Sequence, residues 1–127
     1  MYKRILVIDD DLAIRKAFSL ALEDIDCQVD TVESGEGGID KVSNTEYDLI
    51  FLDLRMPGIN GVETLIRLRD DGCKIPIYIV TAFHGEFMDQ LRVAASEGYE
   101  FEVMQKPIES QNLVRITEAV LEGVGTY

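Results

Sequence analysis

The chain has 127 residues, a mass of 14.3 kDa and a formal net charge of -12, which describes one acidic domain of ordinary size. Its acidity disfavours binding to nucleic acid or anionic membranes, and no apolar run is long enough to cross a bilayer. We therefore expect a cytoplasmic protein that binds no nucleic acid and no membrane, with Cys27 and Cys73 as free thiols.

The first predicted strand is the apolar run ILVI at 5–8. A helix follows it over 14–25, because five apolar residues recur there on one helical face: Ile14, Phe18, Ala21, Leu22 and Ile25. A second strand, QVDTV at 28–32, includes polar residues and is typical of a sheet edge. Ser34 is a plausible cap for a weaker helix from about Glu36 to Ser43.

The remaining elements continue the same alternation. A fully apolar strand, LIFL at 49–52, precedes a helix that carries Val62, Leu65, Ile66 and Leu68 and ends at Gly72. Another apolar strand, IYIV at 77–80, precedes a helix over 86–97 that stops at Gly98. The last strand, FEVMQ at 101–105, reads as an edge, and a fifth helix follows Ser110.

Strict alternation of strands and helices predicts an α/β fold with a parallel sheet and helices on both faces. The polar second and fifth strands belong at the edges, and the apolar first, third and fourth belong inside. The pattern is consistent with a flavodoxin-like (βα)5 three-layer sandwich with strand order 2-1-3-4-5.

Polar residues stand directly after four of the five strands. They are Asp9, Asp10 and Asp11 after the first strand, Asp53 after the third, Thr81 after the fourth and Lys106 after the fifth. Each has an ordinary explanation taken alone, such as a helix cap, a turn residue or a surface lysine. However, the carboxyl ends of parallel strands meet at one edge of the sheet, where ligands bind in such folds. Their joint occurrence therefore favours a functional site.

The chemistry of this set points to a hard cation and phosphoryl transfer. Asp9, Asp10 and Asp53 would repel one another, and one ammonium, Lys106, offsets only part of that repulsion. Oxygen ligands without nearby His or Cys select Mg²⁺, Mn²⁺ or Ca²⁺, and a shallow site that shares its ligands with phosphate suits Mg²⁺ best. Asp53 is the best candidate for a nucleophile that forms an acyl phosphate.

With these residues in place, the chain resembles the receiver domain of bacterial two-component response regulators, from ILVIDDD through DLIFLDLRMPGINGVE and IPIYIVTA to MQKPI. The resemblance implies that Asp9 and Asp10 organise Mg²⁺ (with Mn²⁺ as a substitute), that Asp53 is the phosphoacceptor, and that the backbone carbonyl of Arg55 also binds the metal. It implies further that Thr81 and Lys106 bind the phosphoryl group, and that the bond from Lys106 to Pro107 is cis.

The same resemblance implies partners. A histidine kinase or phosphotransfer protein would dock on the first helix and the loop at Pro107–Ile108, and phosphorylation would act through the face of the fourth helix, fifth strand and fifth helix. The downstream protein is unknown, and a phosphorylation-dependent dimer is possible. We expect residues 1–127 to form one receiver domain without an output domain, whether as a single-domain regulator or a piece of a longer protein. Such a domain assists its own phosphorylation and dephosphorylation and is not otherwise an enzyme.

Three positions depart from the family pattern. Val103 occupies the place of a switch aromatic, for which Tyr99 or Phe101 is a possible substitute. Arg55 and Phe83 flank the path of hydrolytic water in the family, and their bulk indicates an unusual phosphoryl lifetime. A separate expectation is that His84, the single histidine, is exposed and without a chemical role.

Two alternatives remain open from the sequence. Asp9 and Asp11 also satisfy the DxD motif of haloacid-dehalogenase-type phosphatases, which would place the nucleophile at Asp9. The missing aromatic at Val103 favours the other alternative, an interaction module that keeps the fold and works without phosphorylation.

Overall fold

The computed structural model describes residues 2–82 and 85–123, which form a single parallel sheet with helices on both faces. The elements in chain order are β1 (Lys3–Ile8), α1 (Leu12–Ala21), β2 (Cys27–Val32), α2 (Gly35–Asn44), β3 (Leu49–Leu52), α3 (Gly61–Asp70), β4 (Ile77–Thr81), α4 (Met88–Ser96), β5 (Glu102–Gln105) and α5 (Ser110–Glu122). The strand order is β2-β1-β3-β4-β5, which confirms the predicted order.

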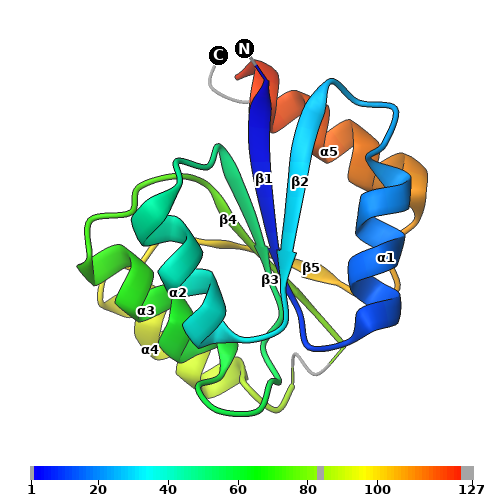
Figure 1. Cartoon of the computed structure of the whole chain (residues 1–127). Helices are drawn as coiled ribbons and strands as arrows, with labels where there is room; N and C mark the ends of the chain where they lie inside the picture. The colour runs from blue at the N-terminus through cyan, green and yellow to red at the C-terminus, as the bar shows by residue number, and fades with distance from the viewer. Residues whose placement is uncertain (1, 83–84, 124–127) are drawn as a thin grey trace.

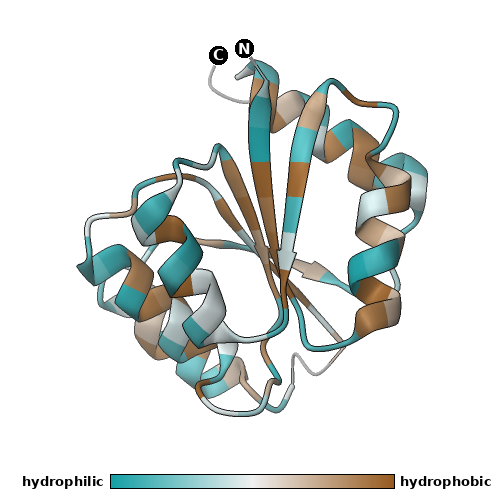
Figure 2. Cartoon of the chain, viewed as in Figure 1, coloured by the Kyte–Doolittle hydropathy of each residue, from teal (hydrophilic) through white to brown (hydrophobic). Residues whose placement is uncertain are grey.

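The sheet separates two hydrophobic cores. Helices α1 and α5 cover one face, and α2, α3 and α4 cover the other (Figure 1). Successive residues of β1 alternate between the cores, because side chains on a strand point to opposite faces. Ile5 and Val7 pack in the core under α1 and α5, whereas Leu6 and Ile8 pack in the core under α2 to α4. Residues of β1, β3 and β4 are therefore mostly hydrophobic along their length (Figure 2).

Side chains start three of the helices at the carboxyl edge of the sheet. Asp11 accepts a hydrogen bond from the backbone N–H of Ala13, and Ser34 accepts one from the N–H of Gly37. Asn60 and Glu63 form a reciprocal capping box at the start of α3. Such caps satisfy N–H groups that have no partner within the helix, so they determine where each helix leaves its preceding loop. The predicted cap at Ser34 is confirmed.

Helix α1 is shorter than the predicted helix over 14–25. It ends at Ala21 with Leu22 as its C-cap, and the chain turns to enter β2 at Cys27. Ile25 still packs against the core under α1 and α5. The apolar spacing thus correctly indicated burial of this segment, although burial continued after the helical hydrogen bonds had ended.

The other boundaries differ by smaller amounts. The fourth helix spans Met88–Ser96 instead of 86–97, and β4 extends by one residue to Thr81. Cys27 and Cys73 are free thiols, as predicted. Within the described ranges, 2–82 and 85–123, no helix has the length and apolar character required to span a membrane.

Candidate functional site

The strand order brings the predicted polar residues to one edge of the sheet. The backbone N–H of Asp53 donates to the carbonyl of Ile8 at 2.9 Å, which sets the end of β3 beside the end of β1. On the other side, the N–H of Lys106 donates to the carbonyl of Thr81 at 3.0 Å, which joins the ends of β5 and β4. The carboxyl ends of β1 and β3 are therefore neighbours, and so are those of β4 and β5, as the parallel fold predicts.

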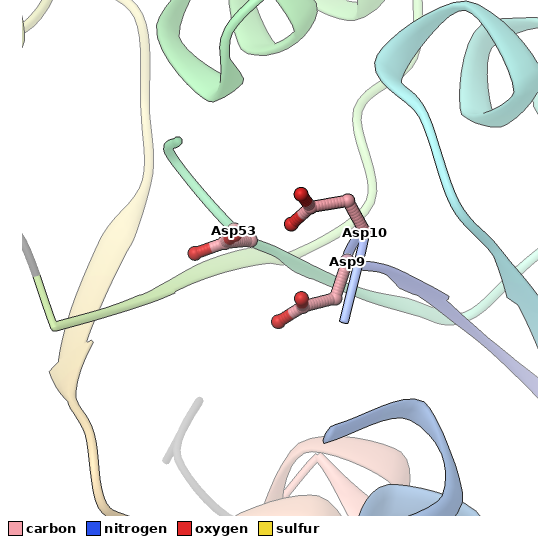
Figure 3. A group of neighbouring side chains, drawn as sticks. All are labelled: Asp9, Asp10 and Asp53. Atoms are coloured by element: carbon pink, nitrogen blue, oxygen red, sulfur yellow. The ribbon is translucent and has the colours of Figure 1, made fainter. Parts of the chain in front are cut away.

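Three aspartates form an acidic cluster in this region. Asp9 and Asp10 follow β1 and Asp53 follows β3, and their carboxylates point to the same side (Figure 3). One carboxylate oxygen from each residue lies within 4.8 Å of the others. Asp9 and Asp53 are only 3% and 5% exposed, whereas Asp10 is exposed. The cluster thus has a buried pair and one solvent-facing member.

Lys106 is the cation that contacts both buried carboxylates. Its Nζ lies 2.9 Å from Oδ2 of Asp9 and 3.4 Å from Oδ1 of Asp53. The other oxygen of Asp9, Oδ1, accepts a hydrogen bond of 2.9 Å from the backbone N–H of Asp11. Both oxygens of Asp9 therefore have partners within the protein, and Asp53 has the weaker contact with the ammonium.

Burial and these contacts raise the pKa of both Asp53 and Lys106, but for different reasons. Burial, together with the negative charge of Asp9, raises the pKa of Asp53 from 3.8 to about 6, and Lys106 reduces that shift only in part. Burial alone would lower the pKa of Lys106, but its hydrogen bond to Asp9 and the charge of Asp53 outweigh burial and raise it. Near neutral pH the site consequently holds a charged ammonium beside carboxylates whose repulsion it does not fully compensate.

The donor set fits a magnesium ion. All three clustered side chains offer hard carboxylate oxygens, the ligand type that Mg²⁺ prefers. Two oxygens bound to the same Mg²⁺ at roughly 2.1 Å are at most about 4.2 Å apart. The oxygens of the cluster lie within 4.8 Å of one another, which is close to that spacing. A divalent cation would also relieve the repulsion that Lys106 leaves.

A cavity of about 570 Å³ opens over the cluster, and its lining includes residues that the sequence did not single out. Met56 and Pro57 line it together with Arg55, and the guanidinium of Arg55 lies 3.6 Å from the carboxylate of Glu86. Arg15 donates from Nη1 to the backbone carbonyl of Asp9 at 2.9 Å. No spacing rule predicts these last two contacts, because each depends on how separate loops and helices meet.

The remaining predicted positions have varied surroundings. Thr81 is fully buried at the end of β4, and the peptide bond from Lys106 to Pro107 is cis, as the resemblance implies. Val103 is 45% exposed on β5. Tyr99 and Phe101 are both partly buried against the core under α2 to α4.

Two expectations concern residues outside the described part of the chain. These are the place of Phe83 beside the path of hydrolytic water and the exposure of His84. Both stay predictions.

Comparison with known proteins agrees with this geometry. Residues 5–118 match the model of the response regulator receiver domain. The chain is 34% identical over 118 residues to the cell cycle response regulator CtrA of Brucella ovis, a match that covers 93% of this chain and 50% of that protein. The chain thus spans about half the length of the curated relatives it matches.

Solved structures have the same architecture. A CheY-like response regulator receiver domain protein from Methanospirillum hungatei has a TM-score of 0.85 at 23% identity, with all of both chains covered. A receiver domain from Methylobacillus flagellatus has a TM-score of 0.78 at 25% identity, over 94% of this chain and 99% of that one. The matched family model covers most of the chain, including every strand end that supplies the acidic cluster and Lys106, and the chain therefore belongs to the response regulator receiver domain family.

Proposed function

We propose that this chain accepts a phosphoryl group on Asp53 from a phosphohistidine of a histidine kinase or phosphotransfer protein, in a Mg²⁺-dependent reaction, and later loses it by autodephosphorylation. The observation that carries this proposal is the contact of a buried Asp53 with Lys106 inside an acidic cluster. An enzyme of the haloacid-dehalogenase type would need Asp9 as nucleophile, and Asp9 is the carboxylate that Lys106 contacts more closely, at 2.9 Å against 3.4 Å for Asp53.

The acidic cluster would hold the metal. Asp9, Asp10 and Asp53, with the backbone carbonyl of Arg55, would bind Mg²⁺, and Mn²⁺ would suit the same oxygens. When bound, the ion supplies positive charge that neutralises oxygens of the transferred phosphoryl group.

The chain's own residues carry the transfer. A carboxylate oxygen of Asp53 attacks the phosphorus, and the new O–P bond forms as the P–N bond to the donor imidazole breaks, with the electron pair leaving on that nitrogen. Lys106, held 2.9 Å from Asp9, neutralises charge on the phosphoryl oxygens. The hydroxyl of Thr81 binds a further oxygen, and hydrolysis of the acyl phosphate later restores Asp53.

Two surfaces would serve partners. A cavity of about 310 Å³ between α1 and the start of α5, lined by Phe18, Pro107 and Ile108 among others, would receive the phosphodonor protein. The face of α4, β5 and α5 would contact the downstream protein, an output domain or a second copy, and it presents Val93 and Val103 at 55% and 45% exposure. We propose that this exchange takes place in the cytoplasm.

Intact mass spectrometry tests the phosphoacceptor. Incubation with acetyl phosphate and Mg²⁺ is expected to add one phosphoryl mass to the wild-type chain and none to Asp53→Asn. Asp48→Asn is a matched control, because Asp48 accepts a hydrogen bond from the backbone of Arg4 at the opposite end of β1. An adduct that persists in Asp53→Asn, or no adduct in the wild type, would refute the proposal.

The exposed Val103 favours a second candidate function. Val103 is exposed where the family has a switch aromatic, which favours an interaction module that works without phosphorylation. Partner binding that is equal for the wild type and Asp53→Asn, with and without acetyl phosphate, would support that alternative.

A further inference from the structure

An ion pair joins the rim of the site to the segment that leads into α4. Arg55 lies two residues after Asp53 and lines the same cavity as the acidic cluster. Its Nη1 lies 3.6 Å from Oε2 of Glu86, which stands two residues before the first residue of α4. The pair thus links a residue that follows β3 and lines the cavity to a residue that lies between β4 and α4.

The Arg55–Glu86 ion pair is weak enough for Arg55 to leave Glu86 for another anion. The side chains of Arg55 and Glu86 are 59% and 51% exposed. Exposed ion pairs contribute little to stability, because water screens the charges and both side chains lose rotamer freedom. A phosphoryl group on Asp53 would offer the guanidinium more than one charged oxygen, and arginine binds such groups through parallel hydrogen bonds. Because Arg55 and Asp53 line the same cavity, a phosphoryl group on Asp53 would compete with Glu86 for the guanidinium and would be the stronger of the two anions.

The start of α4 is the part that such an exchange would affect. Phe87 occupies the N-cap of α4 and makes no side-chain capping bond, whereas α1, α2 and α3 begin with capping side chains. The Arg55–Glu86 pair thus connects the active-site cavity with a helix start that has no side-chain cap. Loss of the pair would change the charge and contacts next to that helix start.

The geometry points to Arg55 as a residue that exchanges partners, pairing with Glu86 before phosphorylation and with the phosphoryl group on Asp53 afterwards, so that Glu86 is released at the start of α4. This inference rests on the proposed function, because it requires a phosphoryl group on Asp53. It assigns a direct binding role to the side chain of Arg55, and it makes Glu86 a competitor whose removal strengthens phosphoryl binding.

Equilibrium binding of beryllofluoride, a phosphoryl mimic, measures this competition in the presence of Mg²⁺. Glu86→Gln is expected to lower the apparent Kd about 3-fold, the size typical of an exposed ion pair. Arg55→Gln is expected to raise the Kd about 10-fold, as for loss of a charge-assisted hydrogen bond. In the double variant, Glu86→Gln should no longer lower the Kd, because Arg55→Gln has already removed the guanidinium for which Glu86 competes.

A second ion pair on α4 supplies matched controls. Asp89 and Arg92 lie 3.7 Å apart and are likewise exposed, but neither lines the cavity over the acidic cluster. Asp89→Asn and Arg92→Gln therefore remove the same charges from the same region, and each should change the Kd by less than about 1.5-fold.

The release of Glu86 has its own readout. The side-chain carboxyl carbon resonance of Glu86 should shift when beryllofluoride is added to the wild type, and in Arg55→Gln it should already be near the shifted position without the mimic. Equal effects of Glu86→Gln in both backgrounds, or a Glu86 resonance that ignores the mimic, would overturn the exchange and leave the phosphoacceptor role intact. A wild-type chain that neither binds the mimic nor accepts phosphate would overturn both.

Discussion

Asp53 is held in a site where ionisation of its side chain costs more free energy than it does in water. Burial and the nearby charge of Asp9 raise its pKa from 3.8 to about 6, while Lys106 opposes that shift from 3.4 Å. The proposed role of Asp53 as a nucleophile requires the ionised carboxylate, so the proposed reaction must overcome this electrostatic cost. This cost leads to one prediction about the pH dependence of stability and another about stabilisation by metal binding.

The first prediction concerns stability against pH without metal. The folded chain binds the Asp53 proton more tightly than the unfolded chain, so this residue's contribution to the free energy of unfolding falls as pH rises from about 4 to about 6. Asp53→Asn has no such titration. Its melting temperature should exceed that of the wild type by roughly 10 °C above pH 7, and the difference should shrink towards zero near pH 4. Calorimetry in EDTA over this range measures it, and a pH-independent difference would contradict it.

The second prediction concerns metal binding by the acidic cluster. Mg²⁺ should raise the melting temperature of the wild type near pH 7.5, because a ligand that binds only the folded state stabilises it by mass action. Asp10→Asn should blunt that gain, since Asp10 is a member of the cluster. Asp40→Asn, an exposed residue of α2, serves as the control. An unchanged melting temperature with Mg²⁺ would contradict metal binding and leave this acidic turn with structural contacts, such as the cap that Asp11 provides for α1.

At the scale of elements, the turn between β3 and α3 limits how Asp53 can be presented. Gly61 donates to the carbonyl of Leu54 at 2.8 Å, and its backbone passes close to the carbonyl of Asp53. A side chain at Gly61 would meet the backbone of both residues, with the Cα of Leu54 at only 2.7 Å. The close approach requires glycine at the first residue of α3.

Gly61→Ala should therefore disturb both folding and the site. We expect a loss of about 1–3 kcal/mol in the free energy of unfolding, typical of overpacking, together with weaker Mg²⁺ binding because the loop that carries Asp53 must move. Gly85→Ala is the control, since a Cβ there would meet nothing within 4 Å. Urea denaturation and calorimetric titration give the two values. Equal stability of the two variants would show that the turn can relax.

Elements also differ in how well their ends can be predicted. Ser34 was predicted as a cap because its hydroxyl suits that role, and α2 does begin directly after it. Helix α1 ends at Ala21 although Ile25 continues its apolar face. Periodicity reports which side chains are buried, whereas the end of a helix depends on where the chain must turn to reach the next strand.

At the scale of the whole molecule, the sheet edge that carries the acidic cluster and the proposed output face are distinct. Val93 on α4 and Val103 on β5 are exposed apolar residues away from the acidic cluster. Replacement of either by glutamate should reduce phosphorylation-dependent association with a partner or a second copy by about 10-fold, since interface contacts at such positions are worth roughly 1–2 kcal/mol. The mass shift on Asp53 should be unchanged. Light scattering with beryllofluoride and intact mass spectrometry measure the two effects, and a reduced mass shift would contradict the separation.

The sequence by itself determined the order of elements along the chain, which strands lie at the edges of the sheet, and which polar residues follow the strands. It could do so because burial on both faces leaves continuous apolar runs, and because parallel strands collect their carboxyl ends at one edge. Asp9, Asp10, Asp53 and Lys106 were therefore predictable as neighbours before any distance was known.

Only the tertiary structure decided how these residues contact one another and which others join them. Three contacts depend on distances between separate elements. Lys106 lies closer to Asp9 than to Asp53, Arg15 donates a hydrogen bond to the carbonyl of Asp9, and Arg55 pairs with Glu86. Local spacing carries no information about such distances, because long side chains can reach many partners and the packing of the helices on the sheet selects among them.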